Sequence, residues 1–395
     1  MHFRLLIGLL LIAANVDVAA QSQSASWPRS SPATQGLDSR PLDSLVARAR
    51  RGVYGNTDQL LVIRNGQLVL DERFPLDYRT ISRGKRSPIG CGTDACTEAM
   101  GAGQYNYLDP ETHPYFRGSP MHTLQSVTKS VTATLFGVAL HRGSLTSLRD
   151  PLLSHLRRYA SAAPDARLQK ATLIDLLTMR SGIEWHENDR PLDSTNTTLL
   201  LEASADWIRF TISQPMDAEP GTKWVYNSGG SALMAEVLRS ATGKHVDEYA
   251  RRELFEPLGI TFQWKMTPTG HPDTEGGLYL SAPDLAKIGQ LYLDDGVWRG
   301  RRLLPPGWAR EATSRVVDHT TTNPASPGYG YQWWRYDRRN TEVWAGNGFG
   351  GQFLLVLPAH QIVAVVNSWN VFGSPAQGIL GPYIDALLDA ARVPR

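Results

Sequence analysis

Short apolar runs predict β-strands at both ends of the chain. Near the N-terminal end, two such runs flank Asn65-Gly66, a pair typical of a tight hairpin turn. The predicted strands are 60–64 and 67–72 in this hairpin, and 329–336, 342–346, 352–357 and 361–367 further on. A last helix is predicted over about 379–391.

The middle of the chain has another periodicity. Apolar residues recur there every three to four positions, as in amphipathic helices. The predicted helices are 172–179, 204–212, 228–242, 246–254 and 281–293. Two strands, then helices, then four strands predict one antiparallel sheet interrupted by a helical insertion. The expected fold class is α+β: an antiparallel sheet flanked by helices, with an inserted helical lobe.

The first twenty residues have the pattern of a secretory signal peptide. Arg4 precedes an apolar run over 5–14, and small residues at 18–20 precede Gln21. The run is shorter than the roughly 20 residues that a bilayer span needs. We expect cleavage after residue 20, export to the periplasm or the medium, and no stable membrane insertion afterwards. An uncleaved N-terminal anchor is the alternative.

After the signal peptide, residues 21–40 are rich in Ser, Gln and Pro and predict a linker. One domain is expected over 41–395. Its α+β lobe would combine 41–145 with 316–395, and its helical lobe would cover about 146–315.

Composition narrows the range of partners. With 42% hydrophobic residues, 20% charged residues and a net charge of +2, the chain resembles an ordinary globular enzyme and not a nucleic-acid-binding protein. The ten histidines show no metal-ligand spacing, so neither a metal nor an organic cofactor is expected. Cys91 and Cys96 lie in an aperiodic stretch over 82–120, and export favours a local disulfide between them. The sequence does not indicate an oligomeric state.

The candidate chemistry begins with Ser126-Val127-Thr128-Lys129, a Ser-x-x-Lys motif. It lies in a helix that is predicted to be capped by Thr123 and to end at Gly143, so the serine and the lysine share one face. A lysine that loses solvation beside a packed helix has a lowered pKa and can accept a serine proton. A second copy of the motif, at 82–85, lies in the aperiodic stretch, where no predicted helix fixes the distance between the serine and the lysine. The competing interpretation is a helix-capping serine beside a solvated lysine.

Two further segments fit the same chemistry. Tyr226 ends a loop just before a predicted helix, where it would act as a proton relay or simply as a packing residue. The stretch 346–351 matches G-x-G-x-x-G, but a strand follows it where a dinucleotide site needs a helix. Its glycines suit close approach of the backbone to a ligand, and one of its amides could form an oxyanion hole with that of Ser126.

Taken in order, these three segments resemble the serine β-lactamase and penicillin-binding-protein superfamily. The stretches at 176–182, 254–260 and 276–287 are similar to its class C β-lactamase-like branch, especially 6-aminohexanoate-dimer hydrolases and family VIII esterases. The resemblance runs from about Leu60 to the C-terminus. It implies a site between the two lobes, with Ser126 as nucleophile, Lys129 and Tyr226 as proton relay, and the amides of Ser126 and Phe349 as the oxyanion hole.

The chain departs from these relatives at two places. Ser228 stands where many of them carry an asparagine, and the sequence leaves open whether it or Asn227 substitutes. Gly346-Asn347-Gly348 lacks the lysine or histidine that in β-lactamases helps to hold the carboxylate of the antibiotic. All five residues are expected to contact substrate.

The predicted function is that of an exported serine hydrolase acting on a small-molecule or short-peptide ester or amide. The alternatives are a D-amino-acid peptidase or weak β-lactamase acting on cell-wall peptides, and a non-catalytic penicillin-binding-like sensor.

Overall fold

The computed structural model describes residues 27–77, 80, 114, 118–163, 165–191, 194–317, 327–370 and 380–392. The cysteine pair and the second Ser-x-x-Lys copy lie outside these residues, as does the predicted signal peptide. The helices are α1 (Ser39–Arg50), α4 (Val127–His141), α5 (Leu152–His155), α6 (Leu173–Leu177), α7 (Thr197–Ala203), α8 (Trp207–Ile212), α9 (Ser228–Thr242), α10 (Val246–Ala250), α11 (Glu256–Leu258), α12 (Ala282–Leu293), α13 (Trp308–Ala312) and α14 (Leu380–Ala391). Short helical turns lie at Ala160–Ala162, Ala166–Lys170, Arg251–Phe255 and Pro358–His360.

The main sheet has seven strands in the order β2-β1-β12-β11-β10-β9-β8, and neighbouring strands are antiparallel. The strands are β1 (Thr57–Arg64), β2 (Gln67–Arg73), β8 (Gly328–Tyr329), β9 (Trp334–Arg338), β10 (Thr341–Gly348), β11 (Gln352–Leu357) and β12 (Ile362–Ser368). A smaller sheet joins β3 (His122–Thr123), β5 (Leu278–Leu280) and β4 (Phe262–Trp264), and a hairpin joins β6 (Val297–Trp298) to β7 (Arg301–Arg302). Both chain ends therefore build one sheet, as predicted, and the α+β class is confirmed.

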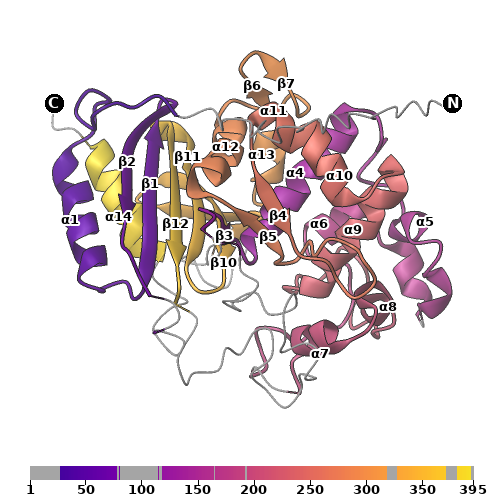
Figure 1. Cartoon of the computed structure of the whole chain (residues 1–395). Helices are drawn as coiled ribbons and strands as arrows, with labels where there is room; N and C mark the ends of the chain where they lie inside the picture. The colour runs from indigo at the N-terminus through magenta and orange to yellow at the C-terminus, as the bar shows by residue number, and fades with distance from the viewer. Residues whose placement is uncertain are drawn as a thin grey trace, which may run out of the picture.

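Helices cover both faces of the main sheet. Figure 1 shows α1 and α14 side by side on one face, with α12 and the helical lobe on the other. Strand β11 illustrates why its sequence is apolar throughout: Phe353 and Leu355 pack toward α1 and α14, whereas Leu354 and Val356 belong to the core shared with α4 and α12. A strand buried on both faces reads as a continuous apolar run.

Several element boundaries differ from the prediction. Thr123 does not cap the helix; it pairs with Tyr279 in the smaller sheet, and α4 begins after Ser126. The strand predicted over 329–336 is divided into β8 and β9, because Gln332 has a left-handed φ of 59°. The segment assigned to a linker lies against the domain from Trp27 onward, where the indole donates to Pro283 O at 2.9 Å.

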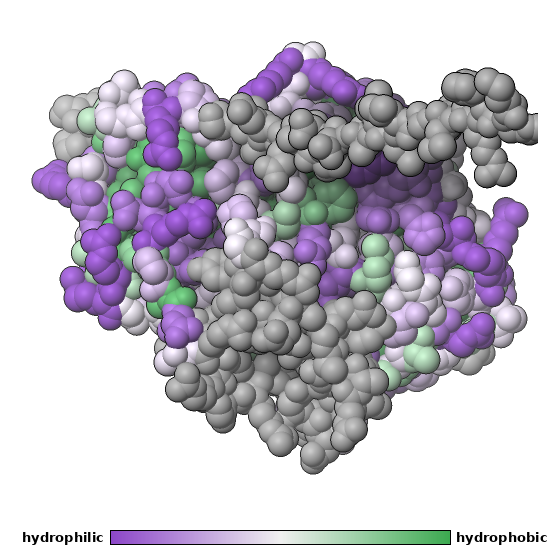
Figure 2. Space-filling view, viewed as in Figure 1, coloured by the Kyte–Doolittle hydropathy of each residue, from purple (hydrophilic) through white to green (hydrophobic). Residues whose placement is uncertain are grey.

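On the face that Figure 2 shows, the surface of the helical lobe is mostly hydrophilic. Apolar surface is visible on the other lobe, near β2. Of the helices within the described ranges, none combines the length and the apolar character that crossing a bilayer requires.

Candidate active site

Ser126 lies in the short connection between β3 of the smaller sheet and the start of α4. Strand β3 fixes the residues before it, and Gln125 takes a left-handed φ of 48° to make the turn. Ser126 occupies the N-cap position of α4, but its side chain makes no capping hydrogen bond. The hydroxyl is therefore not used for capping, and it lines a cavity instead.

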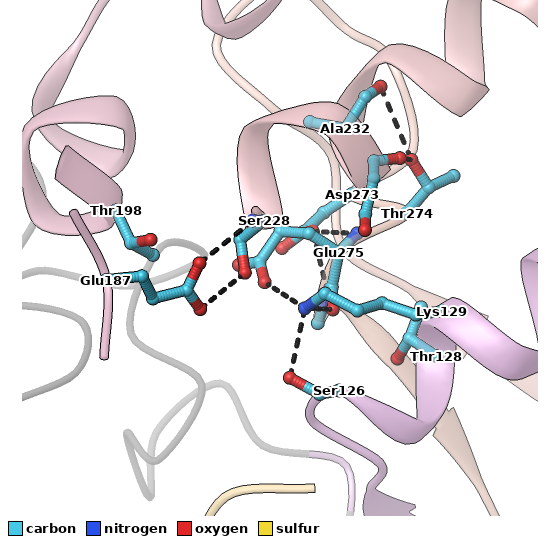
Figure 3. Close-up of polar contacts among 12 residues, drawn as sticks. Ser126, Thr128, Lys129, Glu187, Thr198, Ser228, Ala232, Asp273, Thr274 and Glu275 are labelled. Carbon is cyan, nitrogen blue, oxygen red and sulfur yellow. Dashed lines mark hydrogen bonds and ion pairs between the residues drawn. The ribbon is translucent and has the colours of Figure 1, made fainter. Parts of the chain in front are cut away.

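Lys129 is held by three acceptors. Its Nζ donates to Ser126 Oγ at 3.0 Å, to the main-chain oxygen of Glu275 at 2.7 Å and to Glu275 Oε2 at 3.0 Å (Figure 3). An ammonium has three N–H groups, so this arrangement uses all of them. The side chain is only 1% exposed, and that of its partner Glu275 is 7% exposed.

The electrostatics of Lys129 differ from the prediction. Burial by itself lowers the pKa of a lysine. Negative charge on Tyr226, Glu275 and Glu187 outweighs burial here and raises the pKa of Lys129 above its ordinary value. The expectation of a lowered lysine pKa is therefore wrong: besides Tyr226, two carboxylates that the sequence analysis did not single out lie near the ammonium.

The loop that carries Glu275 is rigidly built. The amides of Glu275 and Gly276 donate to Asp273 Oδ1 at 3.1 and 3.0 Å, and Thr274 Oγ1 donates to Ser231 O in α9 at 2.8 Å. Gly277 approaches Asp273 so closely that an added Cβ would lie 2.6 Å from the Cβ of the aspartate. Figure 3 shows the Glu275 side chain directed at Lys129. The resemblance pointed to the neighbouring glycines, but no local pattern marks the glutamate.

Tyr226 joins the same cluster. Its ring stacks on Trp334 with centroids 5.8 Å apart and an interplanar angle of 17°, and Lys129 Nζ lies 5.4 Å from the ring centroid. Burial raises the pKa of Tyr226, although the Lys129 charge and a hydrogen bond with Ser126 oppose this rise. The structure thus brings together the three residues that the sequence analysis placed in the site.

Asn227 and Ser228 have other roles than substrate contact. Asn227 Oδ1 accepts from Gly230 N at 2.6 Å and caps α9. Ser228 Oγ donates to Glu187 Oε1 at 2.7 Å, and its amide donates to Glu187 Oε2 at 2.9 Å. Neither residue is among the described lining of the cavity, so the prediction that both contact substrate is not supported by their positions.

Glu187 is a second acidic residue that sequence reasoning missed. Its carboxylate lines the cavity and also accepts from Trp185 Nε1 at 3.0 Å. Burial raises the pKa of Glu187, while Lys129 and the Ser228 hydroxyl act in the opposite direction.

Only part of the glycine-bearing end of β10 lies at the cavity. Asn347, Gly348 and Phe349 line the cavity. Gly346 instead faces α4, where an added Cβ would lie 2.9 Å from Val127 Cγ1. Gly346 is not among the described lining of the cavity, so its position does not support the prediction that it contacts substrate.

The two segments proposed for the oxyanion hole touch each other. A Cβ at Gly348 would lie 2.4 Å from Leu124 O, so β10 approaches the turn before α4 with no room for a side chain. This approach brings the Phe349 end of β10 next to the Ser126 turn. The oxyanion-hole role of the two amides stays a prediction.

The cavity has a volume of about 520 Å³ and two unlike walls. One wall is polar and acidic, with Glu187, Asn188, Asn196, Thr198, Glu202 and Glu275; the other is largely apolar, with Trp334, Tyr336, Phe349, Phe353, Leu380 and Ile384. Arg338 is the cationic residue among the described lining, and it is paired with Asp385 through Nε and Oδ1 at 2.7 Å. Lys223, another candidate cation, is paired with Asp217.

Comparison with known proteins places this site in a family. Residues 39–388 match the family model Beta-lactamase, a range that includes Ser126, Lys129 and Tyr226. The chain belongs to the Beta-lactamase family. Members of this family are generally serine hydrolases that act on amides or esters.

Individual relatives agree with this assignment. The chain is 24% identical over 273 residues to a 6-aminohexanoate-dimer hydrolase of Paenarthrobacter ureafaciens, covering 64% of this chain and 68% of that protein. It is 27% identical over 280 residues to penicillin-binding protein 4 of Amycolatopsis lactamdurans, covering 61% of this chain and 70% of that protein. The solved structure of a putative 6-aminohexanoate-dimer hydrolase from Bacillus anthracis superposes with a TM-score of 0.64 at 20% identity, covering 93% of this chain and 88% of that one. The last likeness establishes the shared fold.

Proposed function

We propose that this protein is a serine hydrolase that cleaves an ester or an amide through an acyl-enzyme on Ser126. The observation that carries the proposal is the 3.0 Å contact between Ser126 Oγ and a buried Lys129, with Tyr226 beside them at the wall of a 520 Å³ cavity. A serine that merely capped a helix would not need this arrangement.

The proton acceptor in this scheme is Tyr226. Lys129 donates all three of its N–H groups and has no lone pair for the serine proton, so it orients Ser126 and supplies positive charge. In the phenolate form, Tyr226 takes the Ser126 proton as Oγ bonds to the substrate carbonyl carbon. The carbonyl oxygen becomes an oxyanion, for which the amides of Ser126 and Phe349 are the proposed donors.

The second half of the reaction reverses these transfers. As the oxyanion collapses, the bond to the leaving oxygen or nitrogen breaks, and Tyr226 returns the proton to the leaving group. Water then attacks the acyl-enzyme and gives a proton to the Tyr226 phenolate. When the acyl–oxygen bond breaks, that proton passes to Ser126 Oγ, which restores the starting state.

The lining of the cavity favours a substrate without a free carboxylate next to the reacting carbonyl. Arg338 is engaged by Asp385, and the acidic wall repels anions. A charge-assisted contact is worth about 1.5–3 kcal/mol, and the described lining residues offer no unpaired cation that would form it with a β-lactam or a D-alanyl peptide. We further propose that the protein acts after export, on the strength of the signal-peptide pattern at its N-terminus.

The test is a hydrolysis panel of p-nitrophenyl esters, a linear amide, nitrocefin and a D-Ala-D-Ala peptide, run beside fluorophosphonate labelling of Ser126. We expect the label on Ser126 and turnover of an ester or of the linear amide, both absent in Ser126→Ala. If nothing in the panel is cleaved and Ser126 stays unlabelled, the non-catalytic sensor is the better description.

A further inference from the structure

Glu275 supplies two of the three acceptors around Lys129, and the acyl-transfer scheme gives its buried carboxylate no role. Its Oε2 lies 3.0 Å and its main-chain oxygen 2.7 Å from Lys129 Nζ, although the two residues are 146 positions apart in the chain. Ser228, from the helix that follows the Tyr226 loop, contributes nothing to Lys129, because its hydroxyl and its amide are both directed at Glu187.

We propose that Glu275 is a positioning residue that keeps Lys129 protonated and directed at Ser126, and that it thereby leaves proton uptake to Tyr226. This inference rests on the proposed function, since it assigns a role in the same acyl transfer. Glu275 acts on the reaction through Lys129.

The surroundings of Glu275 are those of a fixed counter-ion. The hydrogen bonds to Asp273 and from Thr274 to α9 hold the backbone of the loop. The side chain of Glu275 is 7% exposed, and its carboxylate is paired with Lys129 at 3.0 Å. A buried lysine that lost this partner would be an uncompensated charge or would lose its proton. Either outcome would change the hydrogen bond between Lys129 Nζ and Ser126 Oγ.

The other charged groups facing the cluster do not replace Glu275. Glu187 influences Lys129 through space, but its oxygens are occupied by Ser228 and Trp185. Tyr226 also feels the negative charges of Glu187 and Glu275, both of which disfavour its phenolate. Neutralising Glu275 should therefore make both Lys129 and Tyr226 easier to deprotonate.

The decisive measurement is the rate at which a fluorophosphonate labels Ser126, followed by intact mass. It is made from pH 6 to about 12, because the pKa of Tyr226 is raised above the ordinary tyrosine value of about 10. Glu275→Gln keeps the size of the side chain and an acceptor oxygen but removes the charge. We expect the midpoint of the rate–pH curve to move to lower pH by up to about 1–2 units, the equivalent of the charged hydrogen bond that Lys129 loses. Glu275→Asp retains the charge at a shorter reach, so its midpoint should stay near that of wild type while its rate falls at least fivefold.

Glu253→Gln is the matched control. It also removes an ion-paired glutamate, but its partner Arg142 follows the far end of α4, about 24 Å from Ser126 along the helix. Its midpoint should equal that of wild type.

The outcomes separate the two proposals. If wild-type Ser126 is not labelled at all, the proposed function fails and this inference falls with it. If wild type is labelled and Glu275→Gln has an unchanged midpoint, Glu275 does not set the protonation of the cluster, although the hydrolase remains. Should Glu275→Gln fail to fold, a wild-type rate in Glu275→Asp, or a midpoint shifted by a unit or more, would still overturn the inference.

Discussion

Replacing Lys129 by methionine should cost stability as well as activity. Methionine fills much of the same space, but the variant leaves the Glu275 carboxylate buried without its cation. Removing one partner of a buried pair costs about 3–5 kcal/mol. For a chain of this length, unfolding entropy converts that loss to a melting temperature lower by about 4–6 °C.

The stability that Lys129→Met loses should depend on pH, and the pKa of Lys129 sets the direction. Because the pKa of folded Lys129 is raised, its contribution is fully present below about pH 10.4, the ordinary lysine value, and is lost only as pH rises through the raised one. The full deficit of Lys129→Met is therefore expected at neutral pH.

The assay is thermal unfolding of wild type and Lys129→Met at pH 4, 7 and 9, with Ser126 labelling on the same samples. A double variant, Lys129→Met with Glu275→Met, should recover most of the lost stability but none of the labelling, because it removes the orphaned charge. A Lys129→Met protein that melts within 1 °C of wild type at pH 7 would refute the reasoning.

Lys287 offers a matched control for this prediction. Its side chain is 1% exposed, and its Nζ donates to Asp284 Oδ1 at 2.7 Å and to Gly259 O at 2.6 Å, so it also forms a buried pair. Lys287→Met should lose stability on the same scale while its folded fraction still labels Ser126. Loss of labelling in both variants would mean that destabilisation, and not the chemistry of Lys129, explains the inactivity.

Four further predictions follow from the site. Ser126→Ala should abolish turnover and labelling in the hydrolysis panel yet melt within about 2 °C of wild type, because its hydroxyl caps nothing and the only bond lost from Lys129 is at the cavity wall; a larger drop in melting temperature would show a structural role. Gly346→Lys should lower stability by about 1–3 kcal/mol or more in urea unfolding and leave nitrocefin turnover no better, since its Cβ meets Val127; a tenfold gain would contradict this placement. Ser228→Ala should lower the free energy of unfolding by about 1.5–3 kcal/mol with ester kcat within severalfold of wild type, because it loses only its bond to a buried carboxylate; a hundredfold loss in kcat would restore it as a substrate contact. The kcat/KM for an ester should rise from pH 6 to pH 9, since the raised pKa of Tyr226 keeps its phenolate scarce near neutrality; a profile that falls over this range would exclude Tyr226 as the base.

Much of the secondary structure was predictable because its determinants are local. The helix predicted over 228–242 has those bounds in the structure, with Asn227 as its N-cap and Gly243 in the left-handed conformation at its end. The hairpin at Asn65-Gly66 and the apolar strand β11 were equally predictable. Asn-Gly favours a tight turn, and burial on both faces requires apolar residues at consecutive positions.

The core of the site was predictable for the same reason. Ser126 and Lys129 are one helical turn apart, so forming α4 is sufficient to bring their side chains to one face. Tyr226, in contrast, was placed beside them only by resemblance, since its position depends on how α9 packs against α4.

Other features were decided by tertiary structure alone. How closely β10 approaches α4 at Gly346 depends on strand register and on helix packing, and there an added Cβ would lie 2.9 Å from Val127 Cγ1. The protonation of Lys129 was predicted in the wrong direction, because the sequence shows that the lysine is beside a packed helix but not what it meets there. Its counter-ion lies 146 residues away, and only the folded chain brings the carboxylate of Glu275 within 3.0 Å of the ammonium.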